Sequence, residues 1–290
     1  MNRMKSAALI ILVMLVTGCG SEPKSVEELV DAGKQAITQQ EYSLAREYFA
    51  KAVAKRPTDR DILYYLGYAY HRDFLLDSAL FYYQRANLLF PNDRETNLQI
   101  YDAAVAFKDW QAAIRAVNVL IATGDPIENW YVRLVDLHAR NGNGGLAYRF
   151  AHNLVEYEPE RPGNFIRWAN AAMVIDSLDL AIRICDSAIK LFGESEEFVA
   201  NRGLYYAYKN DYQMSERIFR SLHEKDTSSE FYILNLANSL ASQKSERKKR
   251  QALELYRTLT PGPDDAYRID SVTRALEATL GLKEGTTRKK

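Results

Sequence analysis

Apolar and small residues recur along most of the chain with the spacing of amphipathic helices. Between residues 60 and 93, the order Leu63-x2-Leu66-Gly67-x2-Tyr70 is followed by Ala79-x3-Tyr83-x2-Ala86-x4-Pro91. Residues three and four apart lie on one face of a helix, so each of these two runs predicts a helix. The proline predicts the end of the second helix, because proline removes a backbone donor. The segment is therefore expected to fold as a pair of helices joined by a turn.

The same pattern returns at a fixed interval along the chain. Six units of equal length fill residues 26–229 without a gap, and a seventh begins at Glu230. The seventh unit gains about three residues around 245–250 before Ala252, Tyr256 and Leu259 resume the pattern. A fixed period of this length predicts a repeat array, in which each unit buries its apolar face against its neighbours.

This pattern resembles the tetratricopeptide repeat, a helix pair with small residues where its two helices touch. The resemblance implies an all-α fold, a right-handed α-solenoid of about seven helix pairs with a capping helix at the C-terminal end. Units three to five carry Tyr101, Val135 and Ala169 in place of the glycine, so we expect them to be less ideal repeats. The units run over residues 26–59, 60–93, 94–127, 128–161, 162–195, 196–229 and 230–266.

The C-terminal end follows a helical pattern without a partner helix. Residues 267–282 predict the capping helix, with Asp265 as a possible N-cap, and the basic residues of 283–290 predict a disordered tail.

The N-terminus has the order of parts of an export signal. Arg3 and Lys5 precede an uncharged run over residues 7–16, which is too short to cross a bilayer. Residues 16–19 read Val-Thr-Gly-Cys and resemble the lipobox of bacterial lipoproteins. The resemblance implies a signal peptide over 1–18, lipid on Cys19 and a tether over 19–25. A conventional signal peptide, or an N-terminal anchor with an incidental cysteine, is the alternative.

Composition and motifs narrow the chemistry. The chain has 38 basic and 38 acidic residues, so it lacks the excess positive charge that attracts nucleic acids, and a nucleic-acid partner is not expected. Two cysteines and four scattered histidines favour neither a disulfide framework nor a metal site. No catalytic motif is found, and we expect no cofactor. The glycine-rich segment at 141–145 is interpreted as a turn, and Cys185 as a buried core residue.

Family resemblance places a binding groove along the first helix of each unit, at positions near 2, 5, 9, 12 and 13. Tyrosine and arginine are enriched at binding hot spots, which draws attention to the second unit. The alternative for Tyr64 and Tyr65 is packing between units. Chaperone-binding members of the family bind the C-terminal carboxylate of a peptide with a clamp of Lys, Arg and Asn side chains. This clamp is not expected here, because position 5 of the units carries no Lys or Asn. The candidate groove residues are Tyr64, Tyr65, Tyr68, His71, Arg72, Asp102, Asp136, Asn170 and Asn238.

These observations favour a non-enzymatic scaffold that is anchored in the cell envelope by its N-terminal lipid and faces the periplasm. It is expected to bind a peptide segment of another envelope protein, in the assembly or recruitment of an envelope complex. Gly20 after the cysteine favours the outer membrane over the inner one. A regulatory or self-oligomerising array is the alternative, and an enzyme whose site follows no motif is a third possibility.

Overall fold

The computed structural model describes residues 25–260 and 262–282, and these residues form fifteen α-helices and no strand. The signal peptide, Cys19 and the tail over 283–290 lie outside the described residues, as does the tether except for Ser25. We call the first helix of each pair an A helix and the second a B helix. The A helices are α1 (Val26–Thr38), α3 (Arg60–Arg72), α5 (Arg94–Phe107), α7 (Glu128–Arg140), α9 (Pro162–Val174), α11 (Glu196–Tyr208) and α13 (Glu230–Ala241).

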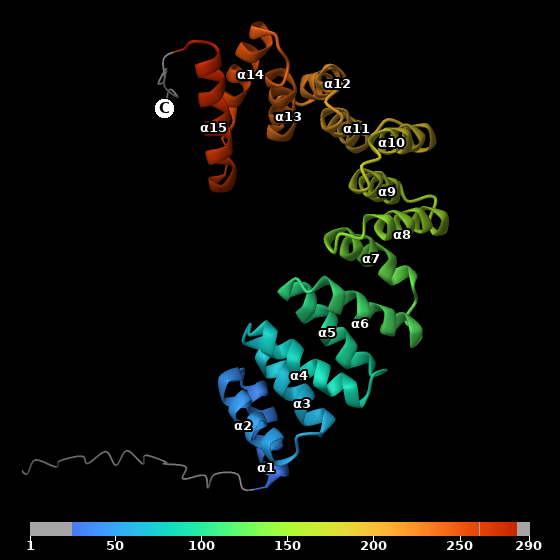
Figure 1. The fold of residues 1–290 in the computed structure, drawn as a ribbon, viewed down its shortest axis with the longest axis vertical. Coiled ribbons are helices and arrows are strands. Elements are labelled where there is room, and N and C mark those ends of the chain that lie inside the picture. The colour runs from blue at the N-terminus through green and yellow to red at the C-terminus, as the bar shows by residue number, and fades with distance from the viewer. Residues whose placement is uncertain (1–24, 261, 283–290) are drawn as a thin grey trace, which may run out of the picture. The chain divides into compact units, whose positions relative to one another are not determined.

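The B helices alternate with them along the chain (Figure 1). Successive B helices start at a constant interval, and the A helices keep the same interval. The B helices are α2 (Tyr42–Lys55), α4 (Leu76–Leu89), α6 (Trp110–Ala122), α8 (Gly144–Tyr157), α10 (Leu178–Phe192), α12 (Tyr212–Lys225) and α14 (Glu246–Thr258). The prediction of an all-α helical repeat solenoid is confirmed.

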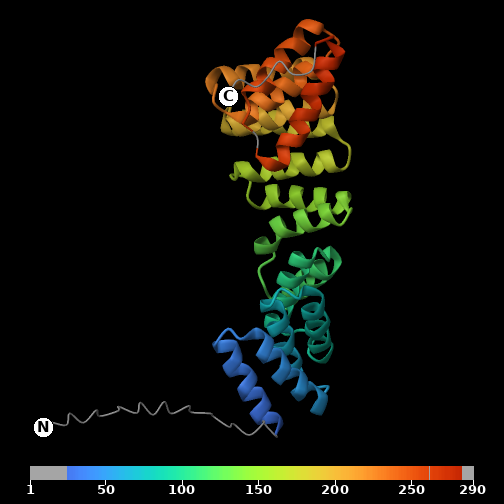
Figure 2. The same cartoon turned by 90° about the vertical axis from the view of Figure 1, so that its left-hand side faces the viewer.

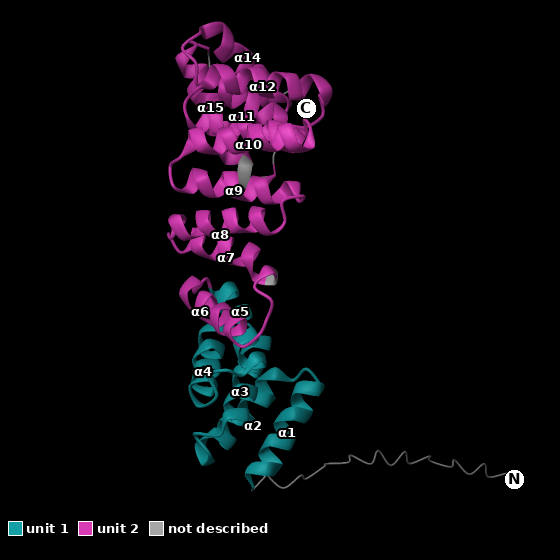
Figure 3. Ribbon diagram, turned by 90° about the vertical axis from the view of Figure 1, so that its right-hand side faces the viewer, with its two compact units in different colours: residues 1–107 teal, residues 108–290 magenta. Residues whose placement is uncertain are grey.

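The chain divides into two compact units, residues 1–107 and 108–290 (Figure 3). The division falls between α5 and α6, within the third predicted repeat. In the first unit, α1 packs on α2 and α3 on α4, and each B helix also packs on the A helix that follows. In the second unit the same scheme joins α7 through α14, which follow one another as stacked layers, and α15 packs on α14 (Figure 2).

The contact between the helices of a pair depends on size complementarity between two residues of the repeat unit. These are the eighth residue, on the A helix, and the twenty-fourth residue, on the B helix; we call them positions 8 and 24. Where position 8 is glycine, position 24 is aromatic, and a Cβ added to Gly67 would lie 2.8 Å from the Tyr83 ring. Gly33 faces Phe49 and Gly203 faces Phe219 in the same way.

The fourth and fifth units, which lack this glycine, carry a smaller residue at position 24. The fourth pair buries Val135 with Ala151, and the fifth buries Ala169 with Cys185. These units therefore lack the glycine without losing the close packing of their helices, because the volume has moved from one partner to the other.

The turn between the helices of a pair also repeats with the period of the helices. Its last residue before the B-helix cap has a positive φ, between 58° and 77°, in each of six successive turns. Gly142 occupies this place in the fourth turn, where glycine adopts such a backbone without steric cost. The turn predicted at 141–145 is confirmed for residues 141–143, which lie between α7 and α8, whereas Gly144 and Gly145 already belong to α8. The six residues are Gln40, Phe74, Lys108, Gly142, Asp176 and Asn210.

The C-terminal end corrects two details of the sequence analysis. The extra residues expected around 245–250 do not displace α14, which begins at Glu246, one repeat period after Tyr212 at the start of α12. The capping helix α15 spans Pro263–Thr279 and so begins before residue 267, with Gly262 and not Asp265 as its N-cap. Proline at the first position of a helix is favourable, because that residue's N–H would have no helical partner.

Candidate functional site

A depression of about 670 Å³ lies on the A helices of the first unit. α1, α3 and α5 form a row there, since α3 contacts both of the others. Three of the predicted groove residues line the depression. We call it the tyrosine depression, and its lining residues are Lys34, Ile37, Arg60, Asp61, Tyr64, Tyr65, Tyr68, Asp93 and Glu95.

The three tyrosines differ in how firmly they are held. The Tyr65 ring stacks on Phe49 at 5.6 Å, so this residue also packs between the first and second pairs, as the alternative interpretation expected. The Tyr64 hydroxyl donates a hydrogen bond to Glu95 Oε1 at 3.2 Å, and burial together with this carboxylate raises the pKa of Tyr64. The half-buried Tyr68 has a hydroxyl without a hydrogen-bond partner among the residues that the structure describes. The Tyr65 hydroxyl likewise has no such partner, so Tyr65 and Tyr68 both keep a polar group available to a ligand.

Charged groups are distributed unevenly around the tyrosine depression. The Arg60 guanidinium lies 5.5 Å from the centre of the Tyr64 ring and binds both Asp61 and Asp93. Partial burial alone would raise the pKa of Asp93, but hydrogen bonds from Thr96 and the charge of Arg60 outweigh it and lower that pKa. The Asp93 carboxylate is consequently ionised at pH 7 and paired with Arg60.

Lys34 stands on α1, away from this group of charges. Its Nζ lies 4.8 Å from the centre of the Tyr65 ring, within the range of a cation–π contact. The Lys34 side chain is exposed, and it forms no ion pair with any carboxylate in the described part of the chain.

His71 and Arg72 were predicted to join the tyrosines, but the structure does not bring them into the tyrosine depression. Arg72 turns to the preceding pair, where its Nε donates to the Tyr42 hydroxyl at 3.3 Å. The His71 ring packs edge-on against Tyr83, and burial lowers the pKa of His71 although Asp102 opposes the shift. Asp102 therefore lies near His71, outside the lining of the depression.

In the second unit, two position-9 asparagines have a common arrangement. The buried Tyr205 donates its hydroxyl to Asn170 Oδ1 at 2.7 Å, and the buried Tyr256 donates to Asn238 Oδ1 at 2.6 Å. The amide oxygens are thus occupied, while the amide NH2 groups have no partner among the described residues. Asp136 is exposed on α7.

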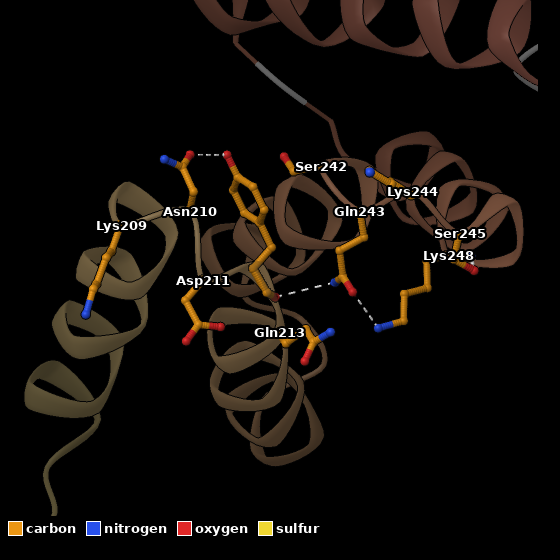
Figure 4. Close-up of a pocket in the computed structure, with 10 residues that line it drawn as sticks. Lys209, Asn210, Asp211, Gln213, Ser242, Gln243, Lys244, Ser245 and Lys248 are labelled. Atoms are coloured by element: carbon orange, nitrogen blue, oxygen red, sulfur yellow. Dashed lines mark hydrogen bonds between the residues drawn. The ribbon is translucent and has the colours of Figure 1, made fainter.

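A second depression, of about 740 Å³, lies at the turns that precede α12 and α14 (Figure 4). Its main polar groups bind one another. Gln243 Nε2 donates to the backbone oxygen of Tyr212 at 3.4 Å, and Lys248 donates to Gln243 Oε1 and to Glu216 Oε2, both at 2.6 Å. Because these groups bind one another between α12, α13 and α14, we interpret this depression as a polar junction between the sixth and seventh pairs.

The groups that can act as nucleophiles or metal ligands are held in other ways. Cys185 is 1% exposed, and burial together with Asp186 raises its pKa to about 12, so the thiol stays protonated. Within residues 25–260 and 262–282, no three His, Cys, Asp or Glu side chains lie close enough to hold a metal ion. None of the described helices is both long and apolar enough to cross a membrane.

Sequence analysis missed the charged residues of the tyrosine depression as site residues. Asp61 and Glu95 stand at position 2 of successive A helices, and Lys34 shares position 9 with Tyr68. These residues therefore stand at repeat positions that the family resemblance assigns to the groove. The direction of each side chain was needed to select them.

No family model matches the chain, and no curated protein matches its sequence. Among solved structures, a tetratricopeptide repeat protein from Parabacteroides merdae is 13% identical, covers 87% of this chain and 98% of its own, and has a TM-score of 0.52. The C-terminal part of a repeat protein from Cytophaga hutchinsonii is 14% identical; the match covers 85% of this chain and 95% of that one, with a TM-score of 0.49. YrrB, described as a TPR protein with an unusual peptide-binding site, is also 14% identical; the match covers 64% of this chain and 95% of that one, with a TM-score of 0.44. The first likeness and the constant period of the helices together show that this chain has the fold of the tetratricopeptide-repeat solenoids.

Proposed function

We propose that this protein is a non-enzymatic interaction scaffold that binds a peptide segment of another cell-envelope protein along its A helices. In this proposal the scaffold assists the assembly or recruitment of an envelope complex. The observation that carries the proposal is the tyrosine depression, where aromatic side chains are held in place while the hydroxyls of Tyr65 and Tyr68 have no hydrogen-bond partner among the described residues.

A surface of this kind suits a peptide for two reasons. The rings of Tyr64 and Tyr65 are held by Glu95 and by Phe49, so little side-chain entropy is lost when a ligand covers them. Tyr68 offers a hydroxyl that can donate to or accept from a peptide backbone.

The asparagines of the second unit extend the proposal to a second stretch of the A helices. Because buried tyrosines occupy the oxygens of Asn170 and Asn238, each amide presents donors to a ligand. Backbone carbonyls of an extended segment are acceptors that fit such donors.

Replacing Tyr68 by alanine tests the proposal, because Tyr68, unlike Tyr64 and Tyr65, pairs with no other ring in the described chain and its loss should spare the fold. Tagged protein is crosslinked in cells and purified, and its partners are identified by mass spectrometry for wild type, Tyr68→Ala and Tyr267→Ala. Tyr267 is 78% exposed on α15 and serves as the matched control. We expect one envelope protein to be lost from Tyr68→Ala alone. Equal recovery from all three proteins would contradict binding at the tyrosine depression.

Membrane attachment is a separate part of the proposal and rests on the sequence around Cys19. We propose that lipid on Cys19 holds the protein at a membrane facing the periplasm, and Gly20 favours the outer membrane. A Cys19→Ala variant should lose both the mass added by lipid and its association with membranes. Unchanged processing and fractionation would contradict lipidation.

Self-association is the second candidate function, and an apolar strip on α4 favours it. Phe81 and Leu88 are 55% and 80% exposed, and they stand seven residues apart, on one side of the helix. Phe74 and Phe90, at the two ends of α4, are 87% and 62% exposed. If these side chains mediate self-association, analytical ultracentrifugation should show a concentration-dependent oligomer that Leu88→Ser abolishes. A monomer at all concentrations would exclude this candidate.

A further inference from the structure

The tyrosine depression carries opposite charges at its two ends. On α1, Lys34 has no carboxylate partner in the described chain and points its ammonium group over the Tyr65 ring. An ammonium group beside a half-buried aromatic surface favours an anion, because both the charge and its N–H donors are available.

The opposite end is acidic. Three carboxylates line the depression there, those of Asp61, Asp93 and Glu95, against the single guanidinium of Arg60. The Glu95 carboxylate accepts hydrogen bonds from Tyr64 and Gln99, which are neutral partners and leave its charge uncompensated. The lining residues at this end therefore sum to about two negative charges, which favours a cation on the ligand.

The helices set the distance between the two ends. Lys34 is on α1 and Glu95 is on α5, with α3 between them. Two interaxial steps of about 8 Å place the ends at most about 16 Å apart, which agrees with the chain of contacts from Lys34 through the Tyr65 and Tyr64 rings to Glu95. An extended peptide rises about 3.3 Å per residue, so this span corresponds to at most about five residues.

We propose that the tyrosine depression selects a bipolar segment, in which an acidic side chain and a basic side chain stand about four or five residues apart. The acidic side chain binds Lys34, and the basic one binds near Asp61 and Glu95. Aliphatic or aromatic residues between them cover Ile37 and Tyr65. This inference rests on the proposed function, since it names the chemistry of the peptide that the scaffold binds.

The test is selection from a random peptide display library on the immobilised full chain. Wild type is compared with Lys34→Glu, and with Lys244→Glu as a control. Lys244 is an exposed lysine of the second unit, and none of the described residues forms an ion pair with it, so the control changes the net charge equally. Peptides selected on wild type are then resynthesised, and their affinities for the three proteins are measured by fluorescence anisotropy.

We expect wild type and Lys244→Glu to enrich peptides with the bipolar spacing. Lys34→Glu should bind these peptides about tenfold more weakly and enrich peptides with Lys or Arg in place of the acidic residue. Enriched peptides without the charge pair, or a charge pair that Lys34→Glu leaves unchanged, would overturn this inference while the proposed function stands. A library that yields no enriched peptide on wild type would overturn both.

Discussion

Replacing Gly67 by alanine tests how the helices of a pair are held together. The new Cβ would lie 2.8 Å from Cδ1, 3.0 Å from Cε1 and 3.2 Å from Cγ of Tyr83. Carbon atoms in good contact are about 3.5–4.0 Å apart, so the ring must move by several tenths of an ångström. Tyr83 is fully buried, and its hydroxyl is bonded to Gln99 at 3.3 Å, which limits that movement.

The magnitude follows from two opposing effects. Overpacking of a buried site costs about 1–3 kcal/mol, whereas alanine in a helix is favoured over glycine by about 0.5–1 kcal/mol. Gly145 provides the control, because it is also helical and a Cβ there would meet no atom within 4 Å. We therefore expect Gly67→Ala to be less stable than Gly145→Ala by about 1–3 kcal/mol.

Urea unfolding followed by circular dichroism measures this difference, and native-state hydrogen exchange of α3 and α4 locates it. In a Tyr83→Leu background, Gly67→Ala should cost at least about 1 kcal/mol less, since the clash with the ring is gone. If Gly67→Ala proves as stable as Gly145→Ala, the proposed size complementarity between positions 8 and 24 is refuted.

Three further predictions concern titration and reactivity. The Glu216 side chain is 12% exposed. Burial alone would raise its pKa, but hydrogen bonds from Lys248, Gln243 and Arg220 lower that pKa from 4.5 to about 2. Its stabilisation, up to about 3 kcal/mol, is present above pH 4.5 and is lost as the pH falls to about 2, so acid titration of stability should be shallower for Glu216→Gln over this range. Burial lowers the pKa of His138 below its ordinary 6.5, so the unfolded chain takes up the proton first and stability should fall as the pH drops through 6.5. Urea unfolding measured at each pH should show a flatter slope for His138→Phe. An unchanged slope would contradict the lowered pKa of His138. The Cys185 thiol should resist iodoacetamide at pH 8 in the native protein and react in urea, as followed by mass spectrometry; rapid native alkylation would show that the fifth pair opens.

The repeat architecture was predictable because one local rule determines it. Small and large residues recur with a fixed period, and each helix starts where that period places it, including α14. The third unit departs from the pattern in the sequence, with Tyr101 in place of glycine, and the chain divides into its two compact units within this repeat. Pro263 shows where a local rule was overlooked, since proline at the first helical position begins α15 before residue 267.

The candidate site was less predictable, because it depends on the direction of each side chain. Arg72 stands next to His71 in the groove column but reaches Tyr42 of the preceding pair. The oxygen of Asn238 is taken by Tyr256, which comes from the following B helix. Such partners depend on rotamers and come from a neighbouring helix, so the pattern of one helix does not reveal them. The predictions for Cys19 and for the membrane remain predictions.

Site-specific photo-crosslinking in living cells tests the central claim most directly. A photoreactive amino acid is placed at position 68, in the tyrosine depression, or at position 81, on the exposed side of α4. The account predicts that a partner protein of the envelope is crosslinked from position 68 and not from position 81. Crosslinking from position 81 alone would contradict the claim that the A helices carry the binding surface.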